Sequence, residues 1–127
     1  IELLGGPVPT DTKMRKQRDL PVTIYRILLY LSRMRDSSPE SRRQVRIERA
    51  VCIDRKEVRE FMIKLENGGL VASKDTGIVG RGGHPIVTWN ITEAGKMWRS
   101  DIGRFIQLGQ RMDMYPEEFF YLPSDAV

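Results

Sequence analysis

Basic side chains gather in residues 41–64, and their type and spacing suit them to binding an anionic polymer. This stretch holds eight cations against four acidic residues, so its excess of four positive charges equals the net charge of the whole chain. A guanidinium group can pair with two acceptors at once, on phosphate or on the O6 and N7 edge of guanine, whereas a lysine ammonium acts as a point charge. The eight cations are Arg42, Arg43, Arg46, Arg49, Arg55, Lys56, Arg59 and Lys64.

A helix that begins at Asp54 is expected to position the last four of these cations. Asp54, followed three residues later by Glu57, is typical of a capping box. The sequence predicts that the helix stops at Gly68 or Gly69, because glycine readily adopts the left-handed conformation found at helix ends. Apolar residues recur at helical spacing and form its buried side: Val58, Phe61, Met62 and Leu65. The cations of the first turns should therefore face outward.

Two further helices are predicted before this one. Residues 22–35 are apolar around most of a helical circumference, which indicates a central core helix. A second helix ends near a short turn at Cys52, where we expect a small buried residue rather than a redox switch. Its buried side should consist of Val45, Ile47, Ala50 and Val51.

Two runs rich in β-formers follow, "LVASKDT" and "PIVTWNIT", and they predict a hairpin. The stretch between them, residues 77–84, holds four glycines and should form a long flexible tip. Arg81 stands among these glycines, and an arginine at such a tip can enter a DNA minor groove. The tip residues assigned to this contact are Arg81, Gly82, Gly83 and His84; the alternatives are a solvent-exposed loop and, for His84, an ordinary loop histidine.

A final helix is expected after the N-cap Thr92, ending at Gly109 or continuing to Met114. Its apolar stripe is assigned to dimerisation, with packing inside the chain as the alternative: Trp98, Ile102, Phe105 and Ile106. The segment "EEFFYL" near the C-terminus either folds back over the domain or docks on a partner, and we expect it to fold back.

The chain divides into an N-terminal arm (residues 1–21), one domain (22–108) and a C-terminal extension (109–127). The arm should carry a short basic helix that starts at Thr10 or Asp11. Its cations either grip the DNA backbone or form a solvated face: Lys13, Arg15, Lys16 and Arg18.

Composition excludes several classes of protein. The single cysteine and single histidine exclude a Cys/His zinc site and an intramolecular disulfide, and they favour a reducing, cytoplasmic location. Arg26 interrupts the most apolar run, which is too short to span a membrane, and no signal peptide is visible. No nucleophile has a base nearby in the sequence, and Glu117 and Glu118 lie in a tail, so neither an enzyme nor a cofactor is expected.

The order of these elements resembles the winged helix-turn-helix superfamily, and more narrowly the MarR- and PadR-like transcriptional regulators. The resemblance covers residues 22–108 and rests on "RIERAVCIDRKEVREFMIKLENGGLV" and "IVTWNITEAGK". Cys52 departs from the family pattern, in which glycine usually occupies the turn between the two helices. The resemblance implies a mainly helical α+β fold with a β-hairpin wing and a C-terminal helix available for dimerisation.

We therefore expect a sequence-specific double-stranded DNA-binding protein, a transcriptional regulator that acts as a homodimer on an inverted repeat and associates with the nucleoid when DNA-bound. Arg55 and Arg59 are assigned to base edges. Phosphate contacts are assigned to Lys56, Arg46, Arg49, Lys64, Arg42 and Arg43. The alternative is a winged-helix protein-interaction or architectural module in a transcription, replication or partition complex. The sequence identifies no small-molecule effector.

Overall fold

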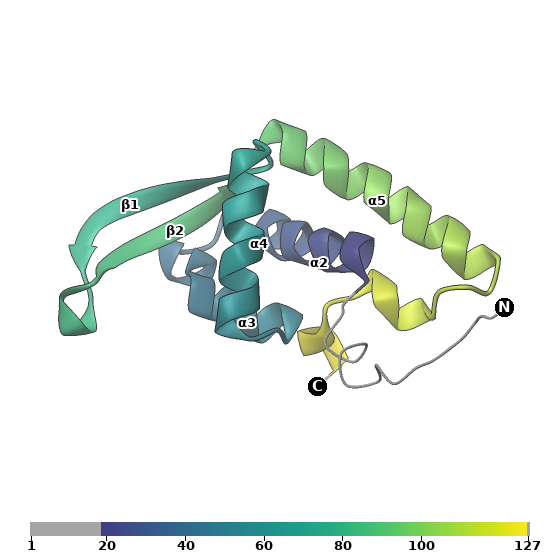
Figure 1. Ribbon diagram of the computed structural model, residues 1–127, viewed down its shortest axis with the longest axis horizontal. Helices are drawn as coiled ribbons and strands as arrows, with labels where there is room; N and C mark the ends of the chain where they lie inside the picture. Colours follow the sequence, from purple (N-terminus) through teal and green to yellow (C-terminus); the bar gives the residue numbers. More distant parts are fainter. Residues whose placement is uncertain (1–18, 127) are drawn as a thin grey trace, which may run out of the picture.

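The computed structural model describes residues 19–126. Its main elements are α2 (Leu20–Arg33), α3 (Gln44–Val51), α4 (Arg55–Asn67), β1 (Val71–Val79), β2 (Pro85–Ile91) and α5 (Glu93–Arg111) (Figure 1). Helices dominate and the two strands form one antiparallel hairpin, so the α+β, mainly helical class is confirmed. The basic helix expected in the N-terminal arm lies outside the described residues.

Helix α2 forms the centre of the hydrophobic core. Asp19 caps it, because its Oδ1 accepts a hydrogen bond from the Val22 N–H at 3.1 Å. Ile27, Leu28 and Leu31 are fully buried, and α5 runs along the same helix. The prediction of a central core helix is confirmed, with both ends two residues earlier than expected.

A short turn joins α3 to α4, and Cys52 determines its shape. This residue has φ 58° and ψ 48°, the left-handed conformation that glycine usually supplies. Asp54 then caps α4 as predicted, since its Oδ1 accepts a hydrogen bond from the Glu57 N–H at 2.9 Å. The expectation that Cys52 is buried was wrong: its side chain is exposed. Left-handed backbone reverses the chain here, and the neighbouring Val51 and Ile53 enter the core instead.

The end of α4 leads directly into the hairpin. Gly69, at φ +79°, donates its N–H to the Glu66 carbonyl at 3.0 Å, and the Leu70 N–H bonds to the Leu65 carbonyl at 2.9 Å. This pair of bonds is a Schellman motif, so the predicted glycine stop is confirmed. Glu66 also fixes the base of β1, because its Oε2 accepts hydrogen bonds from the Ser73 N–H at 3.0 Å and hydroxyl at 2.7 Å.

The hairpin is longer and its tip shorter than predicted. Strand β1 pairs with β2 from Val71 opposite Ile91 to Asp75 opposite Val87, then shifts register before Val79 meets Pro85. Gly77 lies in this irregularity at φ +78°, so it bends the strand without ending it. The tip is therefore confined to Gly80–His84 and is closed by a 2.8 Å bond from the Gly80 N–H to the His84 carbonyl. An isolated bridge from Arg43 to Thr88 ties β2 to the segment before α3.

Helix α5 begins after the predicted N-cap residue, and its glycines do not interrupt it. Thr92 Oγ1 accepts a hydrogen bond from the Gly95 N–H at 3.0 Å. A Cβ at Gly95 would approach the Leu70 carbonyl oxygen to 2.2 Å, and one at Gly109 would approach the Tyr115 ring to 2.5 Å, so both glycines permit close packing. The helix ends at Arg111, beyond Gly109, and is about 28 Å long. Among residues 19–126, no helix is both long enough and apolar enough to cross a membrane.

The C-terminal segment folds back onto α2, as predicted. Leu122 is buried in the same core as α2 and α3. Arg26 donates hydrogen bonds to the carbonyls of Tyr121 at 2.9 Å and Glu118 at 3.0 Å, and its guanidinium lies 5.6 Å from the centre of the Phe119 ring. Figure 1 shows this segment in yellow, returning from the end of α5 towards α3.

Candidate nucleic-acid interface

The first turns of α4 present three cations to solvent. Arg55, Lys56 and Arg59 are exposed, while Val58 and Met62 of the same helix are completely buried; Lys56 lies opposite this buried stripe, and Arg55 and Arg59 lie beside it. The charged groups of the three cations form no hydrogen bond or ion pair with any residue from 19 to 126. The predicted amphipathic arrangement is confirmed, and the three charges are available to a partner.

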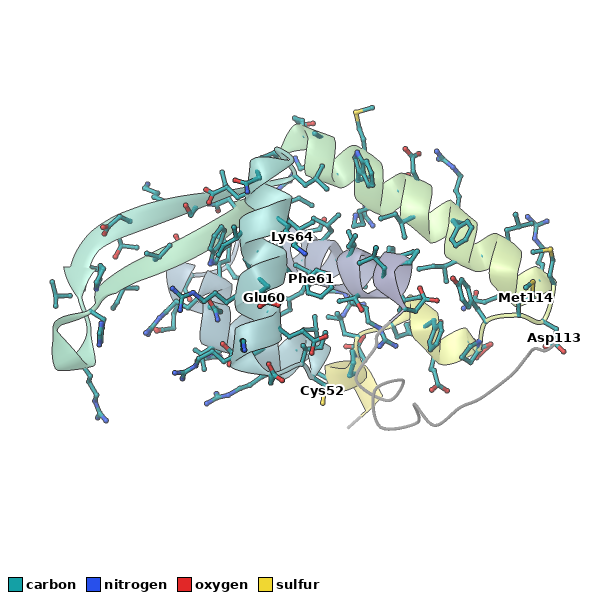
Figure 2. All side chains as sticks on the ribbon, viewed as in Figure 1. Cys52, Glu60, Phe61, Lys64, Asp113 and Met114 are labelled. Atoms are coloured by element: carbon teal, nitrogen blue, oxygen red, sulfur yellow. The ribbon has the colours of Figure 1, made fainter. Side chains whose placement is uncertain are left out.

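Helical geometry separates the cations of α4 into flanks. Residues four apart lie nearly above one another, so Arg55 and Arg59 share the flank that faces the hairpin. Lys64 is rotated about 140° from Arg59 at 100° per residue, and it occupies the other flank. Figure 2 shows Lys64 and Phe61 on the side of α4 that faces away from the hairpin, with Glu60 between the flanks.

Glu60 is a residue of this surface that our sequence reasoning did not single out. It is exposed and lies one turn after Lys56, near the middle of the outward face. A carboxylate in that place disfavours phosphate but can accept a hydrogen bond from the N4 amino group of cytosine. The signal that would have found it is the helical period itself, because residues 56 and 60 lie opposite the buried stripe.

A groove of about 640 Å³ lies between α4 and β2, with α3 at its end. The polar residues that line it are Arg43, Gln44, Glu48, Arg55, Arg59 and His84. The apolar residues that line it are Val45, Ile63, Pro85, Ile86, Val87 and Trp89. Val45 was predicted to be buried, but it is only half-buried because it lines this groove.

Gln44 fixes the corner between α3 and α4 at the end of the groove. Its Nε2 donates hydrogen bonds to Glu48 Oε2 at 3.0 Å and to the Arg55 carbonyl at 3.2 Å. These bonds join the start of α3 to the start of α4. The side chains of Arg55 and Arg59 therefore project from a braced helix.

The arginines before and within α3 divide into structural and free groups. Arg42 Nη1 donates to the carbonyls of Met34 at 3.1 Å, Arg35 at 3.4 Å and Ser37 at 2.8 Å, so it closes the loop after α2. This role inside the chain disfavours the predicted phosphate contact of Arg42, which stays a prediction. Arg43 pairs with Glu40 at 3.0 Å and lines the groove.

Arg46 and Arg49 are the free members of that group. Both are exposed on α3, and neither forms a hydrogen bond or ion pair within the described part of the chain. The positive charge of Arg46 still acts on Tyr30: burial raises the pKa of this phenol, and Arg46 partly offsets the rise. The Tyr30 hydroxyl donates to the Ser41 carbonyl at 2.7 Å, which holds α2 against the segment before α3.

The hairpin tip is a defined turn. Gly82 and Gly83 have φ values of +74° and +77°, which few other residues adopt without strain. Arg81 is exposed near the start of this turn, and His84 lines the groove. Figure 1 shows the hairpin extending from the body beside α4. The structure thus brings Arg55, Arg59 and His84 to one groove and leaves Arg81 farther out.

The four residues assigned to dimerisation do not share one environment. Trp98 and Phe105 are each 51% exposed, and Ile102 is half-buried. These three line a hollow of about 310 Å³ together with Pro21 and Asp101. Ile106 is fully buried in the chain's own core, so its assignment to an intermolecular surface was wrong. The reason is that α5 turns Ile106 towards α2.

Residues 19–126 contain no cluster of three or more His, Cys, Asp or Glu side chains that could hold a metal ion. No family model, curated protein or solved structure matches the chain.

Proposed function

We propose that the chain is a winged helix-turn-helix protein that binds double-stranded DNA at specific sequences and regulates transcription as a homodimer. In this proposal α3 and α4 form the helix-turn-helix, α4 is the recognition helix and the β1–β2 hairpin is the wing. One observation carries it: Arg55, Lys56 and Arg59 are exposed and unpartnered among the described residues, on the first turns of a helix that buries Val58 and Met62 in the core. A recognition helix presents its N-terminal turns to base edges in this way.

The residues of α4 then have distinct roles. Arg55 and Arg59 read base edges from the flank nearest the wing, where a guanidinium fork matches guanine O6 and N7. Lys56 contacts phosphate, and Lys64 reaches a phosphate beyond the other flank. Glu60 accepts a hydrogen bond from cytosine.

Flanking residues position the protein on the duplex. Arg46 and Arg49 contact phosphates from α3, and Arg43 does so from the groove. Arg81 enters the minor groove beside the recognition site. The glycines next to it, Gly82 and Gly83, keep the tip narrow, and His84 lies near the backbone.

A homodimer would place two recognition helices in successive major grooves about 34 Å apart, so the binding site would be an inverted repeat. The exposed face of α5 around Trp98, Ile102 and Phe105 is the surface we assign to self-association. Figure 1 shows that α5 itself runs away from the wing.

The test begins with a binding site selected from random duplexes. Arg59→Ala should weaken binding to the selected site by about 5- to 150-fold, because a good bidentate pair contributes about 1–3 kcal/mol of discrimination. Binding to random duplex should weaken much less. Arg35→Ala is the matched control, because it removes an exposed arginine from the loop after α2. Equal losses on both duplexes would make Arg59 a phosphate contact and overturn the base-edge assignment.

A second candidate function is a protein-interaction module, and the groove favours it. Its lining combines the apolar Ile63 and Trp89 with the basic Arg55 and Arg59, and this combination fits an acidic segment with an apolar anchor. A salt titration separates the two functions. Several phosphate contacts require the logarithm of duplex affinity to fall linearly and steeply with the logarithm of salt concentration. Weak duplex binding without preference among sequences would favour the interaction module.

A further inference from the structure

The far end of the β1–β2 hairpin carries two apolar side chains that the described chain leaves exposed. Val79 of β1 lies opposite Pro85 of β2, so the two side chains share one face of the hairpin. Val79 is 63% exposed, and Pro85 is exposed as well. These two residues form the apolar pair of the wing. Single exposed apolar residues are common, but two side by side at a projecting end are typical of a contact surface.

The charge around the apolar pair indicates a polyanionic partner. Arg81 is exposed in the turn just beyond the pair, and its guanidinium forms no hydrogen bond or ion pair with any residue from 19 to 126. The turn itself, residues 80–84, contains no acidic residue. His84 and Pro85 line the same groove as Arg55 and Arg59. The end of the hairpin is therefore continuous with the proposed recognition surface, and one duplex would meet both.

Contacts inside the hairpin hold its end in a fixed position. A Cβ on Gly80 would approach Ile86 Cγ1 to 3.2 Å, so Ile86 packs closely beneath the turn. The Thr76 hydroxyl donates a hydrogen bond to the Ile86 carbonyl at 2.8 Å and accepts one from the Ile78 N–H at 3.2 Å. These contacts join β1 to β2 immediately before the apolar pair. The pair can therefore press on a partner without folding away.

The hairpin is long enough to reach the groove next to the one that α4 would occupy. Strand β1 has nine residues, so it spans up to about 30 Å at roughly 3.4 Å per residue. Successive major grooves of a duplex are about 34 Å apart, and a minor groove lies between them. Figure 1 shows the hairpin projecting beside α4. A duplex bound by α4 would thus present its neighbouring minor groove to the end of the hairpin.

We propose that the apolar pair enters the minor groove with Arg81, wedges between two stacked base pairs and bends the duplex towards its major groove. The inference rests on the proposed function and adds a deformation of the DNA to it. Proteins that bind the minor groove insert proline and aliphatic side chains in this way and kink the duplex by about 20–90°. Val79 and Pro85 replace part of the lost stacking, and Arg81 lies in the negative potential of the groove.

The wedge defines a class of DNA sequence at the wing. Pyrimidine–purine steps unstack most readily, and of these the TA step has no guanine amino group in its minor groove. We therefore assign a TA step to the position of the apolar pair, beside the base pairs that α4 reads. The preference arises from the cost of deforming the step, without a hydrogen bond to a base.

The first experiment measures the bend of the selected duplex by energy transfer between fluorophores on its two ends. The wild type should bend the duplex by about 20–90°. Val79→Ser combined with Pro85→Ser should lose most of this bend and still bind the duplex through α4. Ile78→Ser is the matched control, because Ile78 is 61% exposed and is adjacent to Val79 on the other face of the strand. A straight wild-type complex, or an unchanged bend in the double variant, would overturn the proposal.

The second experiment locates the unstacked step. The adenine analogue 2-aminopurine, whose fluorescence is quenched by stacking, replaces each adenine of the wing region in turn. Binding of the wild type should raise the fluorescence at one TA step, and the double variant should produce no such rise. Fluorescence that stays quenched at every adenine would show that the bases remain stacked, which contradicts a wedge.

The third experiment combines an altered step with the altered wing. Replacement of TA by AA keeps both base pairs A·T but stiffens the step. It should weaken binding of the wild type by about 5-fold or more, as a changed base pair in a specific site typically does. The double variant, which lacks the wedge, should hardly respond. Equal losses for the two proteins would place the preference elsewhere and refute the wedge.

Failure of the wedge and failure of the proposed function give different results in the same titrations. A wild type without preference for the selected duplex over random DNA would overturn the proposed function itself. Selective binding to a duplex that stays straight, with no response to loss of the apolar pair, would leave the proposed function intact. That second result would assign Val79 and Pro85 to a protein partner and overturn only the wedge.

Discussion

The arginines around α2 and the arginines at the start of α4 carry the same charged group but differ in their partners. Those around α2 are bonded to other parts of the described chain, and those of α4 are not. Arg26, Arg33 and Arg42 are bound to the chain itself: two of them donate to backbone carbonyls, and Arg33 pairs with Asp125 at 3.0 Å. Arg55 and Arg59 have no such partner within residues 19–126. Composition counts all five alike, so charge alone does not distinguish a fold-stabilising arginine from one whose charged group is free among the described residues.

Removal of a bound arginine and removal of a free arginine should therefore have different effects. A bound arginine satisfies carbonyls that would otherwise lose their hydrogen bonds, so its loss should lower stability. A free arginine donates no hydrogen bond to the rest of the described chain, so its loss should change binding and leave the stability of the fold nearly unchanged.

Arg26→Met should have the largest effect on stability. It removes two hydrogen bonds from a charged donor to the carbonyls of Glu118 and Tyr121, and it removes the contact with the Phe119 ring. We expect the free energy of unfolding to fall by about 2–3 kcal/mol, measured by urea denaturation. Arg35→Met should change it by less than about 0.5 kcal/mol. A similar loss in both variants would mean that Arg26 does not hold the C-terminal segment.

Arg42→Met should destabilise the protein by about 2 kcal/mol, because three carbonyls after α2 share its Nη1 group. Duplex binding should be unaffected once the unfolded fraction is corrected. The slope of log affinity against log salt should therefore equal that of the wild type. A slope smaller in magnitude by about 0.9 would return Arg42 to the phosphate contacts.

Cys52→Gly should stabilise the protein by up to about 1 kcal/mol. Left-handed backbone costs a residue with a Cβ roughly 1–2 kcal/mol, and glycine avoids this cost but loses more chain entropy on folding. Thermal denaturation measures the change. Cys52→Ala, which keeps the Cβ, is the control and should not stabilise. A glycine variant less stable than the wild type would show that the side chain itself supports the turn.

Acid should break the ion pair between Arg33 and Asp125, and of the changes considered this one should lower the stability least. The hydrogen bond from Arg33 lowers the pKa of Asp125 below its ordinary value of 3.8. Its contribution to stability is therefore present at neutral pH and is lost as the pH falls below that value. Asp125→Asn should be slightly less stable than the wild type at pH 7, and the difference should vanish at the acid end. A difference independent of pH would exclude the ion pair as its source.

The helices and their ends were largely predictable because local chemistry determines them. Asp54 and Thr92 cap their helices as expected, and Gly69 ends α4 by a backbone conformation that glycine favours. The order of apolar residues predicted the buried side of α4. These features depend on neighbours three or four residues away, which a sequence displays directly.

Features that depend on distant contacts were not predictable in the same way. Gly109 looked like a helix stop, but it makes room for Tyr115 and the helix continues. Gly77 looked like part of a loop, but it lies in an irregular strand pair. Whether a given apolar residue faces the core or a partner depends on how α5 is rotated on α2, and this rotation turns Ile106 inward.

The sequence predicted which residue types form the candidate site, but it predicted only some of the residues that belong to it. Arg55, Lys56 and Arg59 are exposed as expected, but the sequence does not reveal that Arg42 closes a loop. The groove lined by Trp89 and Ile63 could not be predicted from the sequence, because it depends on how α4 and β2 are placed relative to each other. The free and bound arginines differ only in which carbonyls lie nearby after folding.

The most direct test of the central claim, that the free cations of α4 contact DNA, is a titration of isotope-labelled protein with its selected duplex, followed by nuclear magnetic resonance. Backbone amide signals from Arg55 to Lys64 and from Gly80 to His84 should shift most, and the side-chain Nε–H signals of Arg55 and Arg59 should shift while those of Arg26 and Arg42 stay in place. Shifts concentrated outside α4 and the hairpin, or an unchanged Arg59 signal at saturation, would contradict the account.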